Sequence, residues 1–364
     1  MKAAYLTAPG RMATGHAPDP KLQHATDVLL ELQAVGICGS DLHYFRTGRI
    51  GNQVLAAPWI MGHECTAVVA EVGPAVRGLA PGDRVAVDPL IACGRCDQCL
   101  SGRKHTCREQ HFLGCPGQQQ GCLCERLVMP SECCFRVPAQ LSVGAAVLVE
   151  PFAIALHALN QLGSARGKHI AVLGAGPIGL CVLAALRWAG AASVAVTDRL
   201  THRAVMAERQ GATTVHCLET RSGAGSAATG NAAAGDRVER DLVAREMLAA
   251  HPAGVDAVFD CSGEQEALDQ ATTLLAPGGT LVVVGIPETS RVSFDINTWR
   301  RKELSIKNVR RQNECTERAV ELLGSGEIQL DSLITHRFEL ADTQAAFDLV
   351  ASYREGVGKA LITF

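Results

Sequence analysis

The segment Leu173-Gly174-Ala175-Gly176-Pro177-Ile178-Gly179 decides the fold of the second half of the chain. It has the spacing G-x-G-x-x-G and lies between two apolar runs, Ile170–Leu173 and Ile178–Trp188. Glycines at this spacing permit a tight turn between a strand and a helix, and they let the backbone approach a pyrophosphate. The segment therefore predicts a buried strand, a glycine turn and a helix whose first N–H groups face an anion.

An acidic residue stands where the next strand of such a unit would end. Asp198 closes the run Ser193–Thr197, nineteen residues after Gly179. A carboxylate there can bind the hydroxyls of an adenosine ribose, and it repels a 2′-phosphate. We therefore expect NAD as the cofactor. NADP stays open because Arg199 or Arg203 could accommodate that phosphate, and a tight turn without any ligand is the remaining interpretation.

Outward from this turn, strand-like and helical runs alternate, which predicts a parallel sheet with helices on both faces. The runs are Ile170–Leu173, Ile178–Trp188, Ser193–Thr197, Arg203–Gln210, Ala257–Asp260, Glu264–Leu275 and Thr280–Gly285. The first part of the chain reads differently, as short strands separated by Gly and Pro turns, which favours a barrel or sandwich. Its clearest runs are Val28–Val35, Ala67–Val72 and Asp83–Val87. The fold class is thus α/β, with a β-rich part before the parallel sheet.

One segment, Arg221–Asp236, consists almost entirely of Ser, Gly, Ala, Thr and Asn. Such a composition buries too little apolar surface to hold a fixed shape. We expect a mobile surface loop that takes no part in the chemistry.

The bulk numbers describe an ordinary globular protein. The chain has 364 residues, 47% hydrophobic content and a net charge of −3, so nothing in its charge predicts a nucleic acid or an anionic membrane as partner. The N-terminus lacks the apolar core of a signal peptide. The uncharged stretch Ile170–Leu186 contains glycines and a proline near its start, and it is interpreted as strand, turn and buried helix instead of a membrane span. With fifteen cysteines and no signal peptide, a reducing, cytoplasmic location is expected.

Four cysteines form a compact motif with the spacing C-x2-C-x2-C-x7-C: Cys93, Cys96, Cys99 and Cys107. Four thiolates within fifteen residues match a closed tetrahedral zinc site, in which no position remains for water. We predict a structural zinc ion here; a redox-active cysteine cluster is the alternative.

A second set of metal-ligand types lies in Gly36–Glu64. Cys38 stands in Cys38-Gly39-Ser40-Asp41-Leu42-His43-Tyr44, and His63 in Met61-Gly62-His63-Glu64. Catalytic zinc sites take three protein ligands and keep a fourth position open. A thiol and an imidazole are two such ligands, although the pair alone is a weak signal.

These motifs together resemble the zinc-containing medium-chain dehydrogenases, and most closely the sorbitol (polyol) and xylitol dehydrogenase branch. The narrower match rests on Cys38–Tyr44, Gly48–Gly51 and Val149-Glu150-Pro151 with Ile154–His157. The resemblance implies a GroES-like catalytic domain (1–153), a doubly wound Rossmann NAD-binding domain (154–297) and a return to the catalytic domain (298–364). It also implies two zinc ions per chain and a homo-oligomer, either a tetramer or a dimer.

The resemblance further assigns residues to roles. Cys38 and His63 would ligate the catalytic zinc, with Glu64 and Glu150 as ligands or neighbours, and whether either glutamate touches the metal is left open. Ser40 and Tyr44 would line the substrate side, and Tyr44, Glu150 and Arg311 would contact substrate. The implied cofactor contacts are Gly174, Gly176, Ile178, Gly179, Asp198, Arg203, Val284, Gly285, Ile286, Val309, Arg310 and Arg311.

The implied reaction is zinc-dependent transfer of a hydride from a secondary hydroxyl of a polyol to NAD, giving a ketose. Arg310 and Gln312 depart from the family pattern, in which aromatic residues tend to flank the central Arg. This departure leaves the substrate open, and the extra charge would favour a longer or anionic polyol. Threonine, butanediol or a sugar acid are the alternative substrates, and a binding protein that has kept the fold without activity is the alternative of another class.

Overall fold

The computed structural model describes residues 1–218 and 242–364, and the expected loop Arg221–Asp236 lies outside this range. The described chain forms two compact units: unit 1 is Met1–Ala153 with Arg311–Phe364, and unit 2 is Ile154–Arg310. The return to unit 1 comes at Arg311, not at residue 298 as expected. The reason is that strand β18 (Ser305–Asn308) still pairs with the sheet of unit 2.

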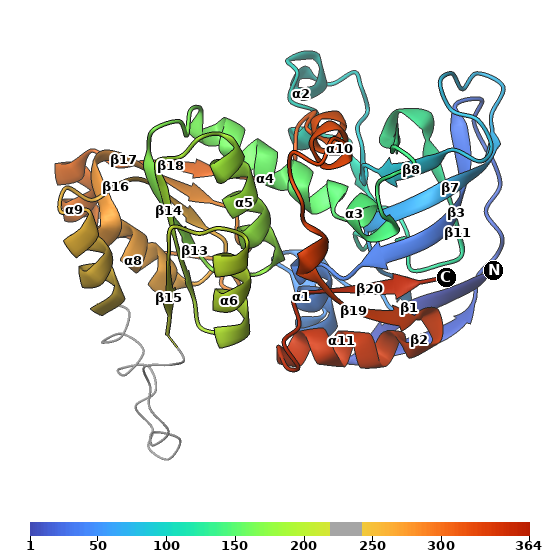
Figure 1. Cartoon of the computed structure of the whole chain (residues 1–364). Helices are drawn as coiled ribbons and strands as arrows, with labels where there is room; N and C mark the ends of the chain where they lie inside the picture. Colours follow the sequence, from blue (N-terminus) through green and yellow to red (C-terminus); the bar gives the residue numbers. More distant parts are fainter. Residues whose placement is uncertain (219–241) are drawn as a thin grey trace. The chain divides into compact units, whose positions relative to one another are not determined.

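Unit 2 is built on a parallel sheet with the strand order β15-β14-β13-β16-β17-β18 among the described residues. Its other strands are β13 (His169–Leu173), β14 (Ser193–Asp198), β15 (Thr214–Cys217), β16 (Val255–Asp260) and β17 (Leu275–Val283). Helices α5 (Pro177–Trp188) and α6 (Thr201–Arg209) pack on β13 and β14, while α8 (Gln265–Leu274) and α9 (Ile296–Lys302) pack on β16 and β17 (Figure 1). This order is that of a doubly wound dinucleotide-binding sheet, which confirms the predicted fold class.

Unit 1 contains a seven-stranded mixed sheet with the order β12-β8-β7-β3-β20-β19 and β11 paired to β3. These strands are β3 (Asp27–Gly36), β7 (Glu64–Val72), β8 (Arg84–Val87), β11 (Arg126–Pro130), β12 (Cys134–Arg136), β19 (Ile334–Glu339) and β20 (Lys359–Thr363). Apart from the parallel β19–β20 pair, its neighbours run antiparallel. The C-terminal segment thus completes the sheet begun by the N-terminal one (Figure 1).

Shorter elements complete unit 1. They are β1 (Lys2–Ala8), β2 (Arg11–His16), β4 (Arg49–Ile50), β5 (Gln53–Val54), β6 (Trp59–Ile60), β9 (Leu90–Ile91) and β10 (His111–Phe112), with helices α1 (Gly39–Thr47), α2 (Asp97–Leu100), α3 (Val143–Val147), α10 (Thr316–Gly324) and α11 (Thr343–Ser352). Helix α4 (Val149–Leu162) contains the boundary between the units, and four 3₁₀ turns cover Lys104–Thr106, Ser131–Cys133, Asp331–Leu333 and Leu340–Asp342.

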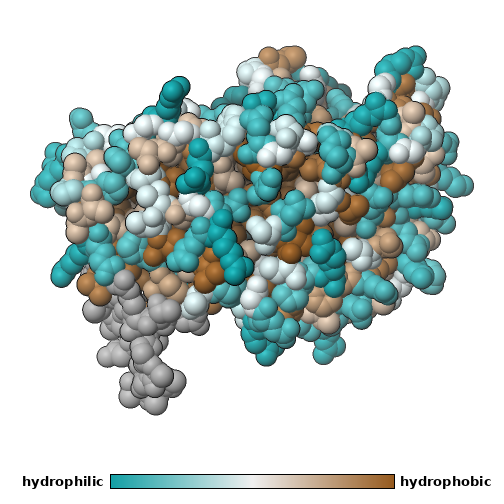
Figure 2. Space-filling view, viewed as in Figure 1, coloured by the Kyte–Doolittle hydropathy of each residue, from teal (hydrophilic) through white to brown (hydrophobic). Residues whose placement is uncertain are grey.

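Each unit has its own apolar core, formed by inward-facing residues of its sheet and helices. Figure 2 shows hydrophilic and hydrophobic residues intermixed over the face drawn. Within residues 1–218 and 242–364, no helix has the length and apolar character that a membrane span requires.

Candidate active site

The first candidate ligand is placed by a helix start. Cys38 is the N-cap residue of α1, and the Asp41 carboxylate accepts a hydrogen bond from the Cys38 backbone N–H at 3.0 Å. An acidic residue in the first turn also favours the helix through its dipole. Asp41 therefore fixes the backbone that carries the Cys38 thiol.

The second and third candidates come from the start of β7. In the ladder between β3 and β7, Gly36 pairs with Glu64. Gly36 lies two residues before Cys38 in the sequence. This register brings together ligand atoms of Cys38, His63 and Glu64, all within 4.8 Å of one another. The expected pair of thiol and imidazole thus does meet, with a carboxylate beside it.

Asp41 and Ser40 lie on the two sides of the His63 ring. Asp41 Oδ1 is 3.5 Å from Nδ1 of His63, and Ser40 Oγ is 3.5 Å from Nε2. Burial lowers the pKa of His63, but the charges of Asp41 and Cys38 outweigh it and hold this pKa well above its ordinary value. The groups around His63 therefore favour a positive charge at this position.

Glu150 enters from the first turn of α4 and is 5% exposed. Its Oε2 atom is buried without a hydrogen-bond partner. Burial, and to a lesser degree the charge of Glu64, raise the pKa of Glu150 to about 8 against the opposing charges of His63 and Lys359. A buried carboxylate oxygen without a partner costs free energy unless a cation or donor meets it. With a thiol and an imidazole nearby, this donor set fits zinc.

Glu64 is held by a residue that the sequence did not single out. Lys359 Nζ donates to both carboxylate oxygens of Glu64, at 2.6 and 2.8 Å, and to the carbonyl of Ile37 at 3.1 Å. The side chains of Lys359 and Glu64 are only 2% and 1% exposed. The charge of Glu64 is thus compensated from β20, whereas Glu150 forms no ion pair within the described residues and feels Lys359 only at longer range.

The residues expected on the substrate side, Tyr44 and Arg311, also lie in unit 1. The guanidinium of Arg311 lies 3.8 Å above the ring centre of Phe112, and its Nη1 donates to Gln110 at 2.6 Å. The Phe112 ring is 5.4 Å from that of His63. Tyr44 donates to Gln53 at 3.2 Å, and burial raises the pKa of Tyr44 above its ordinary value, with the charge of Arg311 opposing. Arg311 and Tyr44 are therefore close enough to influence one another.

The four-cysteine motif is folded as a compact cluster. Ligand atoms of Cys93, Cys96, Cys99 and Cys107 all lie within 4.8 Å of one another. Backbone N–H groups, first that of Arg108, lower the pKa of Cys96 to about 6. Backbone donors aimed at a thiolate, with four sulfurs at this spacing, fit a closed zinc site.

The glycine turn in unit 2 has the geometry that a pyrophosphate requires. Gly174 has a φ of +99°, and a Cβ at Gly179 would lie 1.9 Å from the Gly174 carbonyl oxygen, so both positions exclude a side chain. A Cβ at Gly176 would meet nothing closer than Arg203, at 3.6 Å. The open space at Gly176, at the N-terminus of α5, is where a phosphate could approach the backbone.

Asp198 ends β14, as expected, and also braces the turn. Its carboxylate accepts the N–H of Ala175 at 2.6 Å and that of Leu200 at 2.8 Å. Arg199, a possible ligand for a 2′-phosphate, is paired with Glu264 at 2.7 Å.

The other expected cofactor contacts fall at the ends of neighbouring strands. Val284 and Gly285 donate their N–H groups to Asp260 after β17, and Ile286 next to them is 43% exposed. Val309 donates to Val283. Arg310 ends unit 2, and Arg311 begins the returning part of unit 1. Ile178 lies in the first turn of α5.

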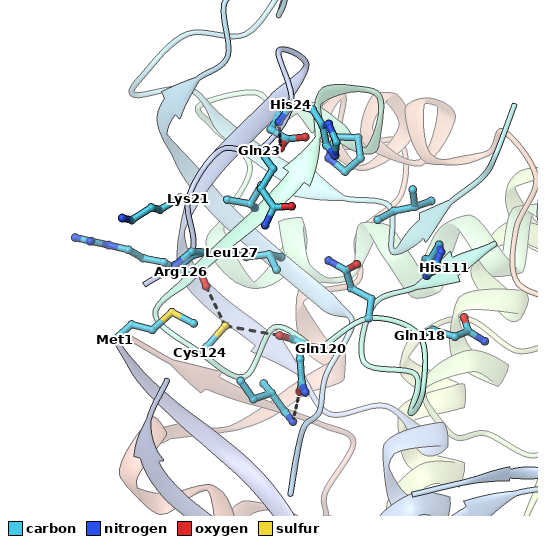
Figure 3. A pocket seen from close by; sticks show the side chains of 18 residues that line it. Met1, Lys21, Gln23, His24, His111, Gln118, Gln120, Cys124, Arg126 and Leu127 are labelled. Carbon is cyan, nitrogen blue, oxygen red and sulfur yellow. Dashed lines mark hydrogen bonds between the residues drawn. The ribbon is translucent and has the colours of Figure 1, made fainter. Parts of the chain in front are cut away.

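A cavity of about 530 Å³ lies elsewhere in unit 1. Figure 3 shows Lys21, Arg126 and Met1 on one side of it and His111 and Gln118 on the other. None of the predicted site residues lines it.

Sequence reasoning missed Lys359, Phe112, Gln110 and a role for Asp41. Asp41 had a signal, because an acidic residue three positions after Cys38 is an N-cap pattern. The sequence signal for Lys359 was weak, since it is only a lysine at the start of an apolar strand.

Known proteins resemble this chain over its whole length. Residues 24–139 match the family model "Alcohol dehydrogenase GroES-like domain", and residues 177–325 match "Zinc-binding dehydrogenase". Sorbitol dehydrogenase of Bacillus subtilis (strain 168) is 33% identical, with 100% of this chain and 97% of the relative covered. L-idonate 5-dehydrogenase of Vitis vinifera is 32% identical, with 89% and 85% covered. A zinc-binding dehydrogenase of Sinorhizobium meliloti 1021, solved with bound NADP, has a TM-score of 0.84 at 29% identity, with 100% and 99% covered.

Fold and site together define an oxidoreductase with a GroES-like part and a nucleotide-binding part. The chain belongs to the zinc-containing alcohol dehydrogenase family, and its curated relatives place it with the enzymes of polyols and related sugar compounds.

Proposed function

We propose that this protein is a zinc- and NAD-dependent dehydrogenase that oxidises a secondary hydroxyl of a polyol such as sorbitol or xylitol to a ketose. The observation that carries the proposal is the cluster of Cys38, His63 and Glu64 together with the orphaned, buried oxygen of Glu150, whose pKa responds to the charge of His63. Tyr44 and Arg311 belong to the same unit. The sorbitol dehydrogenase relative supports the substrate class.

The bound groups have simple tasks. A zinc ion held by Cys38, His63 and Glu150 would supply Lewis acidity, and a nicotinamide dinucleotide at the glycine turn would supply the hydride acceptor. A second zinc ion would be held by Cys93, Cys96, Cys99 and Cys107.

The protein's own residues then move the proton and orient the substrate. Burial raises the pKa of Glu150 and so makes its carboxylate a stronger base, which can accept the proton of the substrate hydroxyl once a cation beside it keeps the carboxylate ionised. The Ser40 hydroxyl, 3.5 Å from His63, can pass that proton towards solvent. Arg311 and Tyr44 donate hydrogen bonds to the other hydroxyls of the polyol substrate. Lys359 keeps the charge of Glu64 from adding to that of Glu150.

The alternative substrate is a sugar acid. Arg311 stacks on Phe112, and Arg310 precedes it, so cationic groups are available for a carboxylate. The L-idonate 5-dehydrogenase relative favours this alternative over threonine or butanediol.

The test is a panel of polyols and sugar acids with NAD and NADP, followed at 340 nm, with zinc counted per chain. Activity with a polyol and NAD, lost on chelation, and two zinc ions per chain are expected. Glu150→Gln should keep zinc but lower kcat by about 10²- to 10⁴-fold, because the proton acceptor is removed. Glu71→Gln, at an exposed position of β7, is the matched control. An unchanged kcat in Glu150→Gln would contradict the assigned role.

We also propose that the chain works as a homo-oligomer, a dimer or tetramer. Support comes from β18, which ends the described sheet of unit 2 and is exposed along its length. Ile306 on this strand is 41% exposed, and Ile296 on α9 is 70% exposed. An uncovered edge strand with apolar side chains is a template for pairing. Light scattering of the native chain and of Ile306→Lys tests this, with a smaller particle expected for the variant.

We also propose that the protein is located in the cytoplasm. All fifteen cysteines are free thiols, including the four that would hold structural zinc. Such thiols persist in a reducing compartment. Fractionation of the expressing cell would check this.

A further inference from the structure

The four-cysteine motif belongs to a lobe that contacts the substrate side of the site. We define the lobe as residues 92–110, and β9 and β10 pair with each other at its two ends. We define the linker as Arg311–Glu314, which leads into α10. Figure 1 shows α2 of the lobe next to α10.

The tip of the lobe holds the far end of the linker. Asn313 Nδ2 donates to the carbonyl oxygen of Gly102 at 2.9 Å. Lys104 Nζ lies 3.2 Å from Oε1 of Glu314. Gly102 and Lys104 both lie between Cys99 and Cys107, so their positions depend on the cysteine cluster.

The base of the lobe holds the near end of the linker. Gln312 is buried, donates to the Asp88 carboxylate and accepts the Cys315 N–H at 2.7 Å. Asp88 lies just before β9. Arg311 is held by Gln110 and by the Phe112 ring, on the other arm of the same two-stranded ladder. Each residue of the linker therefore has a contact with the lobe or with the residues that flank it at its base.

The backbone of the linker needs these contacts. Arg311 and Glu314 have φ values of 55° and 56°, in the left-handed region that side chains other than glycine rarely adopt. Such conformations persist where the surroundings hold them. If the lobe loosened, the linker could relax, and the guanidinium of Arg311 would leave the Phe112 ring.

We propose that the four-cysteine lobe is a positioning device for Arg311, so that a metal site remote from the reacting hydroxyl controls how tightly the substrate is held. This inference rests on the proposed function, in which Arg311 contacts the substrate. Asn313 and Gln312 are then positioning residues that act through Arg311.

The first experiment separates positioning from folding. Asn313→Ala should raise KM for the polyol about three- to tenfold, the effect of weakening one hydrogen-bonded contact. It should leave kcat, KM for NAD, zinc content and Tm close to those of the native chain. Ser101→Ala is the matched control, because it also removes one exposed hydrogen bond, at 3.0 Å to the Gln98 carbonyl, but both partners of that bond belong to the lobe. An unchanged polyol KM in Asn313→Ala contradicts the proposal.

The second experiment does not depend on activity. Amide hydrogen exchange is compared between the native chain, Asn313→Ala and Cys107→Ser, each without substrate. We expect residues 311–315 to exchange at least about tenfold faster in both variants, with β3 and β7 unchanged. Equal exchange of residues 311–315 in all three proteins overturns the inference. A native chain that oxidises no polyol or sugar acid contradicts the proposed function instead, and the exchange result still decides whether the lobe holds the linker.

Discussion

The buried ion pair between Lys359 and Glu64 allows the sharpest test of the architecture. Lys359→Met keeps the length of the side chain but removes the cation from a carboxylate that is 1% exposed. Both oxygens of Glu64 lose their donor, as does the carbonyl of Ile37. Removing one partner of a buried pair costs about 3–5 kcal/mol, since the other charge is left uncompensated. That is a large part of the 5–15 kcal/mol that typically separates folded from unfolded chains.

The magnitude can be isolated by a double-mutant cycle. The double variant Glu64→Gln with Lys359→Met removes both charges. Its loss of unfolding free energy should be smaller than the sum of the two single losses by about 2 kcal/mol or more. Urea unfolding is followed by the fluorescence of Trp59, the tryptophan of unit 1, in a background with Trp188→Phe and Trp299→Phe and at fixed zinc concentration.

Arg318→Met is the control. Its pair with Glu321 is 2.7 Å long, but the two side chains are 50% and 56% exposed, so the change should cost less than about 1 kcal/mol. If Lys359→Met costs no more than Arg318→Met, the reasoning about Glu64 is wrong.

Three further predictions concern the turn, the cofactor and pH. Gly179→Ala should prevent unit 2 from folding, because its Cβ would lie 1.9 Å from the Gly174 oxygen, whereas Gly176→Ala should fold normally but weaken dinucleotide binding at least about tenfold; circular dichroism and NADH fluorescence titration separate the two. Asp198→Ala should reduce the preference for NAD over NADP, measured as a ratio of kcat/KM values, and an unchanged ratio would show that the carboxylate does not select the cofactor. Burial raises the pKa of Asp88 to about 6, so the folded chain keeps this proton to higher pH than the unfolded chain. The contribution of Asp88 to the free energy of unfolding is therefore full below the pKa of the unfolded chain and is lost as the pH rises to about 6. In Asp88→Asn, the free energy of unfolding should fall less between about pH 4 and 6 than in the native chain.

Local patterns in the sequence carried most of the fold. The glycine turn, the apolar run before it and Pro177 at the first helical position predict β13 and α5, because each depends on neighbours a few residues away. The cysteine spacing predicts a cluster for the same reason. The predicted return to unit 1, at residue 298, comes too early. Strand β18 (Ser305–Asn308) is polar and exposed, so nothing in its sequence indicates that it pairs with β17 in unit 2.

Residues joined by long-range pairing escaped the sequence analysis. Lys359 and Glu64 are 295 positions apart, and Gln312 and Asp88 are 224 apart. Their contacts follow from the pairing of β20 with β3 and from the docking of the linker on the lobe. No periodicity within either segment contains that information.

The place of β20 in the sheet also bears on how the protein is made. A ribosome completes all of unit 2 before it synthesises β20, although β20 lies between β3 and β19 in unit 1. Domains generally fold as units during synthesis, starting from the N-terminal side. Unit 2 can therefore fold while the segment Ala34–Gly36 of β3 is still uncovered and Glu64 still lacks Lys359. During that interval the C-terminal end of β3 has no partner on the side that β20 will cover, and this is the stage at which a chaperone would have most to protect.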